Sequence, residues 1–341
     1  MVRIGLVGIG FMGMVHYLAA QKVKGGRVVA LHTRDKKKLA GDWRGIRGNF
    51  GPPGTLTDLG KVRRYERFDD LLADPDVDLV DICTPTNLHE PMAVAALKAG
   101  KHVLVEKAIA LETRAADAMV KAARRAGRLL MVAHVLPFVP PFAFAAEAIR
   151  SGKYGRLLAA HFTRVISRPD WSADIGDASK TGGPAIDLHV HDTHFIGLVA
   201  GVPAKVFSTG RVAADGSVEY LTTQYHYGDG GPAVTCSSGA VAMNGRPFVH
   251  GYEIYLEKAT LAFSSAGQPL TVYSPDGKAR VPKLKGGDDP FGAFTTEIQA
   301  AVDGVVRGSE PDLLSGRLAR DALALCHKEC QSVRTGKAVA V

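Results

Sequence analysis

The feature that most constrains the fold is a glycine turn, Gly8-x-Gly10-x-x-Gly13, close to the start of the chain. It follows an apolar run at residues 3–7, typical of a buried parallel strand, and precedes residues 14–22, which have helical apolar spacing. A second apolar run completes a strand–helix–strand unit. In such a unit the first glycine permits the tight turn, the second lets a phosphate approach the backbone, and the third lets the helix pack against the strand. The sequence therefore predicts a dinucleotide at the helix N-terminus, where free N–H groups face the pyrophosphate.

The end of the second predicted strand indicates which dinucleotide binds. An NAD site usually has an acidic residue there, about 20 residues after the glycine turn, to bind the ribose hydroxyls. Here the strand ends in Thr33 and Arg34: threonine does not repel a phosphate, and arginine can pair with one. Three lysines at residues 36–38 add positive charge. The sequence therefore predicts NADP in preference to NAD, with the alternative that Asp35 is the ribose acid of an NAD site.

Predicted strands and helices alternate as far as residue 136, although residues 35–67 are expected to form only a helix followed by a loop. Such alternation is typical of a doubly wound parallel sheet with helices on both faces. Prolines at residues 137, 140 and 141 break this pattern, and the chain beyond residue 157 is rich in strands with turn-like links. We therefore expect an α/β fold: a Rossmann-type NAD(P)-binding domain at residues 1–136, then an α+β substrate-binding and oligomerisation domain with a large, mostly antiparallel sheet at residues 137–341.

Composition and charge argue against several other classes of protein. The 341 residues are 46% hydrophobic and 22% charged, which is ordinary for a soluble globular protein. The net charge is +8, but the basic residues are scattered and form no stripe interleaved with aromatics, so we expect no nucleic-acid partner. No apolar stretch reaches the ~20 residues of a membrane span, and no signal-peptide pattern precedes the first strand. We expect a cytoplasmic protein that acts on a small molecule.

Four motifs occur in a fixed order along the chain. They are the glycine turn, Cys83-Thr84-Pro85-Thr86-Asn87-Leu88-His89, Glu106-Lys107, and Gly182-Gly183-Pro184-Ala185-Ile186-Asp187 continuing to His191-Asp192. In this order they resemble the glucose–fructose oxidoreductase/inositol dehydrogenase family, often called Gfo/Idh/MocA, over nearly the whole length. The resemblance implies an NAD(P)-dependent dehydrogenase or reductase acting on a CH–OH group of a sugar, inositol or related polyol. The expected cofactor contacts are Gly8, Gly10, Phe11, Met12, Gly13, Thr33, Arg34, Thr84, Pro85, Asn87, His89, Glu106 and Lys107.

One position departs from the family pattern. The family has Glu-Lys-Pro at the end of the strand predicted at residues 102–105. This chain has Glu106-Lys107-Ala108 at that place. The peptide before that proline is often cis in the family, and cis peptides are rare before any other residue. We therefore expect either a cis peptide before Ala108 or a trans loop that places Lys107 differently.

By the resemblance, Lys107, Asp187 and His191 form the catalytic set. Asp187 and His191 are four residues apart, so they share one face if the segment is a helix. Histidine suits the base that takes the alcohol proton, because its pKa lies near neutral. Lysine can hydrogen-bond the substrate oxygen and stabilise negative charge there, while the aspartate orients its partners. The cofactor carries the hydride.

Other polar residues are candidates for the substrate pocket or for ordinary loop packing. Trp171 could stack on the apolar face of a sugar ring. The histidines at 189, 191 and 194 also look like a metal cluster, but on a helix His189 points away from Asp187, and zinc would need a strand. We expect no metal. The candidate substrate contacts are His134, Arg168, Trp171, Lys180 and His194.

Two other functions remain open at this stage. Some proteins that resemble this family hold NAD tightly and cleave glycosides through transient oxidation, and they would share the catalytic set. A non-catalytic dinucleotide sensor is the other alternative, although such proteins usually lose the catalytic residues. The second face of the predicted antiparallel sheet suggests a subunit interface, so we expect a homodimer or homotetramer.

Overall fold

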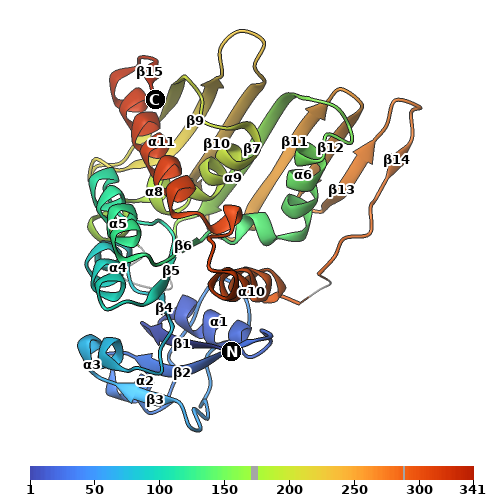
Figure 1. Ribbon diagram of the computed structural model, residues 1–341. Coiled ribbons are helices and arrows are strands. Elements are labelled where there is room, and N and C mark those ends of the chain that lie inside the picture. The colour runs from blue at the N-terminus through green and yellow to red at the C-terminus, as the bar shows by residue number, and fades with distance from the viewer. Residues whose placement is uncertain (170–175, 287–288) are drawn as a thin grey trace. The chain divides into compact units, whose positions relative to one another are not determined.

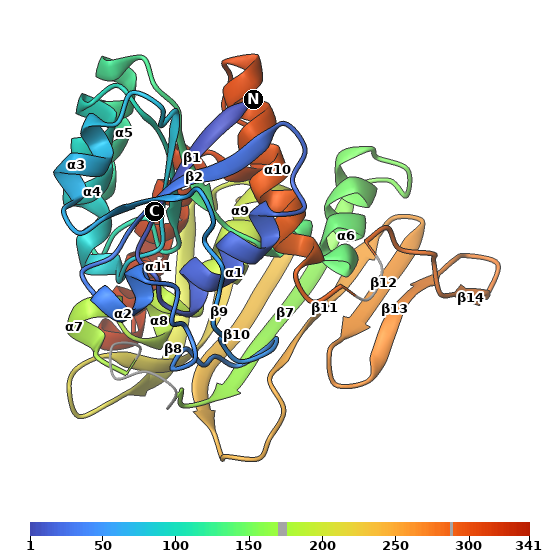
Figure 2. The same ribbon diagram turned by 90° about the horizontal axis from the view of Figure 1, so that it is seen from below.

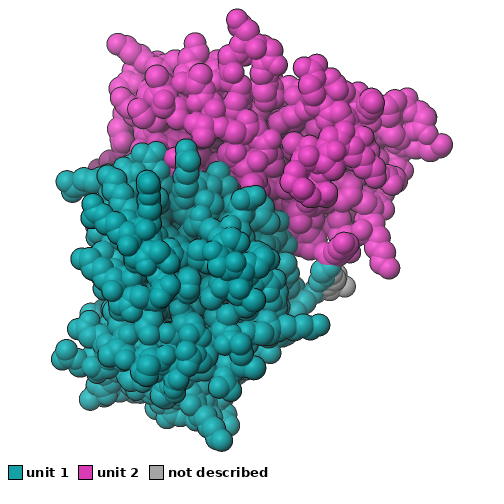
Figure 3. All heavy atoms as spheres, viewed as in Figure 1, with its two compact units in different colours: residues 1–138, 286–320 teal, residues 139–285, 321–341 magenta. Residues whose placement is uncertain are grey.

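The computed structural model describes residues 1–169, 176–286 and 289–341, and these form two compact units (Figure 3). The first unit contains Met1–Phe138 and Gly286–Arg320, and the second contains Val139–Lys285 and Asp321–Val341. The first segment ends close to the predicted boundary. The later segment differs from the prediction, which assigned everything after residue 136 to one domain. Apolar spacing in residues 286–320 predicts a helix, but it does not show against which sheet that helix packs.

The first unit is built on a six-stranded parallel sheet in the order β3-β2-β1-β4-β5-β6 (Figure 1). The order reverses between β1 and β4, and ligands of such sheets bind at the carboxyl ends of the strands at this point. Helices α4 and α5 pack together on one face, while α1 and α10 pack together on the other (Figure 2). The strands are β1 (Val2–Val7), β2 (Gly26–His32), β3 (Arg63–Tyr65), β4 (Leu79–Ile82), β5 (His102–Glu106) and β6 (Leu130–Ala133). The helices are α1 (Phe11–Ala20), α2 (Lys36–Leu39), α3 (Phe68–Ala73), α4 (His89–Lys98), α5 (Thr113–Ala126) and α10 (Gly292–Arg307), with 3-10 turns at Thr86–Leu88, Leu136–Phe138 and Asp312–Leu314.

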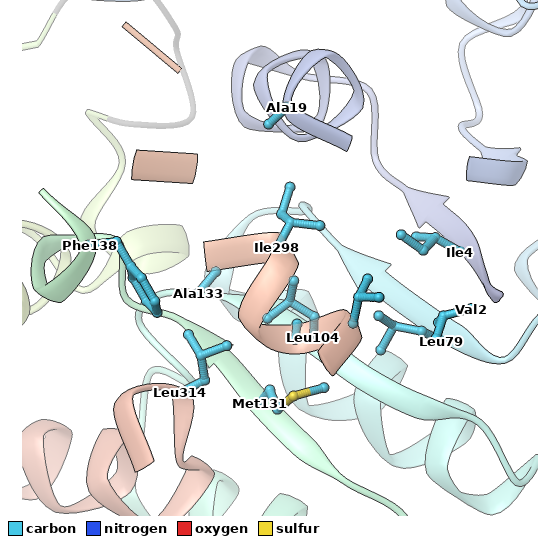
Figure 4. Close-up of a cluster of buried hydrophobic side chains, with 12 residues drawn as sticks. Val2, Ile4, Ala19, Leu79, Leu104, Met131, Ala133, Phe138, Ile298 and Leu314 are labelled. Carbon is cyan, nitrogen blue, oxygen red and sulfur yellow. The ribbon is translucent and has the colours of Figure 1, made fainter. Parts of the chain in front are cut away.

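Apolar packing explains why α10 belongs to the first unit. Ile298, Ala301 and Val302 of this helix are almost completely buried in one cluster with side chains of the parallel sheet (Figure 4). The cluster also contains Val2, Ile4, Ala19, Leu79, Leu104, Met131, Ala133, Phe138 and Leu314. Because burial of each large aliphatic side chain contributes about 1.5–3 kcal/mol, α10 supplies a substantial part of this core.

The second unit is built on a nine-stranded sheet in the order β14-β13-β12-β11-β7-β10-β9-β8-β15. Neighbouring strands are antiparallel except for β7 and β10, as predicted for a mostly antiparallel sheet. Alternate residues of β7 are buried, among them Phe162 and Arg164, and α9 packs against this strand. The strands are β7 (Leu157–Ser167), β8 (Lys205–Val212), β9 (Val218–His226), β10 (Ala233–Ala242), β11 (Val249–Leu256), β12 (Ala259–Ser264), β13 (Gln268–Tyr273), β14 (Ala279–Arg280) and β15 (Val339–Ala340). The helices are α6 (Pro140–Arg150), α7 (Ala178–Thr181), α8 (Pro184–Asp187), α9 (Val190–Ala200) and α11 (Gly316–Thr335), of which α11 begins in the first unit.

One strand lies in a segment where only a helix and a loop were expected. β3 forms the edge of the parallel sheet from Arg63, Arg64 and Tyr65, a polar triplet without the apolar run of a buried strand. Edge strands need no such run, which is why the prediction missed it. No helix among the described residues has the length and apolar character that a membrane crossing requires.

Candidate active site

The glycine turn has the geometry that its sequence predicts. Gly8 has φ of +89°, in the left-handed region that favours glycine. A Cβ on Gly13 would lie 2.0 Å from the carbonyl oxygen of Gly8, so only glycine allows α1 to approach the strand so closely. A Cβ on Gly10 would meet no protein atom within 4 Å, and α1 has no side-chain cap at this position. The first turn of α1 is therefore open to a phosphate group.

Thr33, Arg34 and Asp35 follow the end of β2 and place a hydroxyl, a cation and a carboxylate there. Thr33 is buried, and its Oγ1 accepts a hydrogen bond from the backbone N–H of Asp35 at 3.3 Å. The Asp35 carboxylate in turn accepts from the backbone N–H groups of Lys37 and Lys38 at 2.9 and 3.2 Å, and so caps α2. Arg34 is exposed. Both of these bonds go to Oδ1, and the Asp35 side chain is exposed, so the geometry is compatible with either Arg34 or Asp35 as the ribose contact.

The segment after β4 presents some of its residues outward and buries others. Thr84 and Pro85 are partly exposed and Asn87 is exposed, as expected of residues that can contact a cofactor. His89 is fully buried, and its ring nitrogens lie 2.8 Å from the carbonyl oxygen of Ala108 and 2.9 Å from that of Thr84. Sequence reasoning placed His89 beside the cofactor. Its two ring contacts connect the loops that follow β4 and β5.

Glu106 and Lys107 lie at the carboxyl end of β5. Glu106 is buried, Lys107 is partly exposed, and the peptide between Lys107 and Ala108 is cis, the first of the two predicted alternatives. The backbone N–H of Lys107 donates to Oε2 of Glu106 at 2.9 Å. Burial acts to raise the pKa of Glu106, but the close contact with His16 and the charges of His16 and Lys107 hold it below its usual range. Glu106 is therefore a buried carboxylate.

In the second unit, Asp187 and His191 lie on two short helices rather than one. Gly182 and Gly183, with φ of +83° and +74°, make the turn into α8, which ends at Asp187, and α9 begins three residues later. The predicted single helix is therefore interrupted. Asp187 and His191 are nevertheless partly exposed, whereas the residues between them and on either side are buried. The segment thus presents these two polar side chains outward.

Buried polar contacts hold this segment from behind. Both oxygens of Asp192 accept from the Arg164 guanidinium, at 2.7 and 3.0 Å, and both side chains are almost fully buried. Nε2 of His189 lies 2.9 Å from Oε2 of Glu329 on α11. His189, Asp192 and Cys236 place one ligand atom each within 4.8 Å of one another, but the Arg164 cation on Asp192 opposes a metal cation there. His189 lies between α8 and α9 and is fully buried, unlike Asp187 and His191.

Two family models match this chain. A family model described as an oxidoreductase family with an NAD-binding Rossmann fold, GFO_IDH_MocA, matches residues 2–134, and a GFO/IDH/MocA C-terminal domain model matches residues 142–262. The chain belongs to the Gfo/Idh/MocA family of NAD-binding oxidoreductases.

The relatives of this Gfo/Idh/MocA protein include two inositol dehydrogenases. Myo-inositol 2-dehydrogenase of Thermotoga maritima is 27% identical over 272 residues, which are 78% of this chain and 74% of that protein. Inositol 2-dehydrogenase of Rhizobium meliloti is 27% identical over 359 residues, covering 100% of this chain and 99% of the relative. The crystal structure of an oxidoreductase from Agrobacterium radiobacter, in complex with NAD+, L-tartaric acid and magnesium, is 22% identical and covers 99% of this chain and 98% of its own, with a TM-score of 0.79. At that identity it shows the shared fold.

The candidate substrate contacts of this family member differ in accessibility. His134 and His194 are fully buried, and burial lowers the pKa of His194 to about 3, so these two side chains belong to the interior. Arg168 is exposed and donates to Glu219 at 3.2 Å, and Nζ of Lys180 lies 3.8 Å from a carboxylate oxygen of Asp177. Trp171 lies outside the described residues.

Sequence reasoning missed a second kind of residue in this Gfo/Idh/MocA chain. His16 of α1 and Glu297 of α10 are fully buried ionisable side chains close to Asp81 and Glu106. A histidine on the predicted buried face of the first helix was the only available signal. Glu297 gave none, because its sheet partner is distant in the sequence.

Proposed function

We propose that this chain is an NAD(P)-dependent dehydrogenase or reductase that transfers a hydride between the nicotinamide and a secondary alcohol or ketone of a sugar, inositol or related polyol. One observation carries the proposal: Lys107, Asp187 and His191 are each partly exposed next to buried neighbours. A side chain that has only a packing role would be buried with the rest of its segment. The names of the inositol dehydrogenase relatives support the substrate class.

Each residue has a role that follows from its chemistry. When bound, the nicotinamide cofactor accepts or donates the hydride. His191 takes the proton from the alcohol, or returns it in the reverse direction, because imidazole can do both near neutral pH. The Lys107 ammonium donates a hydrogen bond to the same oxygen and stabilises negative charge on it. Asp187 orients the group that contacts the oxygen.

The catalytic assignment is tested with a screen of sugars and inositols, following the absorbance of reduced nicotinamide. Lys107→Ala and His191→Ala should each abolish turnover and leave the cofactor dissociation constant within about twofold of wild type. His161→Ala is a matched control, because this histidine lies on β7 and contacts Thr235. Full activity of His191→Ala would show that another group is the base. Hydrolysis of a nitrophenyl glycoside without added cofactor would instead support the glycosidase alternative.

We also propose that the preferred cofactor is NADP. Arg34 is exposed beside Thr33 at the end of β2, and Oδ1 of Asp35 caps α2. Replacing Arg34 with Ser should weaken NADPH binding about 10–100-fold, since a hydrogen bond to a charged group is lost, and leave NADH binding nearly unchanged. Lys36→Ser is the control: this lysine is also exposed, but its Nζ lies 3.9 Å from Glu66. Tighter binding of NADH than NADPH by the unaltered protein would overturn the proposal.

The second unit also supports a proposal about assembly. One face of its sheet packs against α9, whereas Glu253 and Tyr255 of β11 are exposed and, by the alternation along the strand, belong to the opposite face. We expect that face to pair with another copy in a homodimer or homotetramer. Light scattering should give a mass of two or four chains, and Tyr255→Glu should lower it. A monomer at micromolar concentration would contradict this assignment.

A further inference from the structure

A buried histidine in the first unit lies between two carboxylates. His16 is fully buried on α1. Its Nδ1 lies 2.9 and 3.1 Å from the two carboxylate oxygens of Asp81 on β4. Its Nε2 lies 3.1 Å from Oε1 of Glu106 at the end of β5. This contact is an ion pair and does not meet the geometry of a hydrogen bond. The imidazole therefore connects the glycine-turn helix to the ends of two neighbouring strands.

Glu106 continues this chain of contacts to the next residue. While Oε1 faces His16, Oε2 accepts the backbone N–H of Lys107 at 2.9 Å. Each oxygen of one buried carboxylate is thus held by a different partner. Because a carboxylate is a rigid plane, fixing one oxygen against His16 also fixes the direction in which the other receives Lys107.

We propose that His16, held between Asp81 and Glu106, is a positioning residue for Lys107. The inference rests on the catalytic role proposed for Lys107, and it adds a residue that touches neither the substrate nor the cofactor. His16 acts through Glu106: it sets the orientation of the carboxylate that holds the backbone at the start of the lysine side chain. A displacement of about 1 Å at a catalytic group can reduce the rate on the order of a hundredfold, so such support matters for turnover.

The charges around His16 agree with a protonated ring. Burial acts to lower the pKa of His16, but the charge and hydrogen bond of Asp81 raise it well above its ordinary value. The groups that face the ring from the packed elements are Asp81 and Cys83 at the end of β4, Glu106 of β5 with Lys107 beside it, and Glu297 of α10.

Burial disfavours the charged forms of two of these groups. It raises the pKa of Glu297 well above its usual range, and it also raises that of the Cys83 thiol.

The same side chains could be considered as a metal site, because His16, Asp81 and Cys83 place ligand atoms within 4.8 Å of one another. One observation favours the proton instead: each ring nitrogen of His16 already faces a carboxylate. The arrangement suits an imidazolium that joins two carboxylates.

The test compares His16→Gln, Glu106→Gln and the double variant in the intact protein. Each single change should lower kcat about tenfold to a hundredfold, while the cofactor dissociation constant of His16→Gln stays within twofold. If His16 acts through Glu106, the double variant should be no slower than Glu106→Gln alone. Glu297→Gln is the matched control: this residue is equally buried beside His16, burial disfavours its charged form, and glutamine keeps its shape, so its kcat should equal that of wild type.

Several outcomes overturn the inference. They are an unchanged kcat in His16→Gln, a double variant whose losses multiply, or an equal loss in Glu297→Gln, which would indicate general damage to the core. If His16→Gln does not fold, His16→Gln/Asp81→Asn removes the cation together with a carboxylate that it balances, and the same comparison applies. Lys107→Ala separates this inference from the proposed function. If that variant keeps its turnover, the catalytic role of Lys107 fails and the positioning role fails with it. If turnover is lost but His16→Gln is normal, only the positioning role fails.

Discussion

The ion pair between Arg164 and Asp192 joins β7 to α9, the helix that carries His191. Its two hydrogen bonds are 2.7 and 3.0 Å long, and the side chains are 5% and 0% exposed. Arg164→Met removes the cation and leaves the Asp192 carboxylate buried without it. We expect a large loss of stability, because the interior cannot hydrate the remaining charge.

The magnitude follows from this geometry. Removing one member of a buried pair costs about 3–5 kcal/mol in the free energy of unfolding. For a domain of about 150–250 residues, each 1 kcal/mol lowers Tm by about 2–4 °C, so the Tm of the second unit should fall by about 6–20 °C. In Arg164→Met/Asp192→Leu both charges are absent, and most of this loss should be recovered, because buried pairs replaced by apolar residues are often neutral in stability.

Differential scanning calorimetry on the intact protein measures these changes, since it can resolve separate transitions of two units. Arg168→Met is the control: Arg168 also pairs with a carboxylate, that of Glu219, but its side chain is 67% exposed, and such pairs contribute little. The reasoning is refuted if Arg164→Met melts within about 2 °C of wild type, or if the double variant melts as low as the single one.

Three further outcomes are expected. Gly13→Ala should lower the stability of the first unit by about 1–3 kcal/mol, because its Cβ meets the Gly8 carbonyl, whereas Gly10→Ala should melt normally in calorimetry and lose cofactor binding in a fluorescence titration. His194→Gln should weaken the loss of stability at acid pH. The folded-state pKa of His194, about 3, lies below its unfolded value of 6.5, so the wild-type free energy of unfolding falls by about 1.4 kcal/mol per pH unit as the pH drops between these values. Urea midpoints measured across this pH range would show the difference. Ile298→Ala should cost about 2–5 kcal/mol by urea unfolding if α10 covers the parallel sheet as described, and an unchanged midpoint would contradict that packing.

Local patterns predicted most of the fold. The glycine turn between two apolar runs indicated the parallel sheet, and the change after the prolines indicated the second, mostly antiparallel one, because both signals depend on neighbouring residues. β3 escaped because an edge strand of Arg63, Arg64 and Tyr65 has no apolar run. The packing of α10 also escaped, since apolar spacing shows that a helix has a buried face but not what covers it.

The sequence indicated which residue types could form the candidate site, but not which of them are exposed. Lys107, Asp187 and His191 are accessible, as their proposed chemistry requires. His89 and His194 have the same side chain as His191, but both lie in the interior. Only tertiary packing separates these cases, because an imidazole is compatible both with a site and with a buried contact.

The division of the chain also has a consequence for synthesis on the ribosome. Residues 1–138 emerge before α10, so their sheet lacks Ile298 and Val302 until that helix has also been made. An N-terminal fragment ending at residue 138 would therefore expose an apolar surface and is prone to aggregate. We expect the two units to complete their folding together, after translation, and not one after the other.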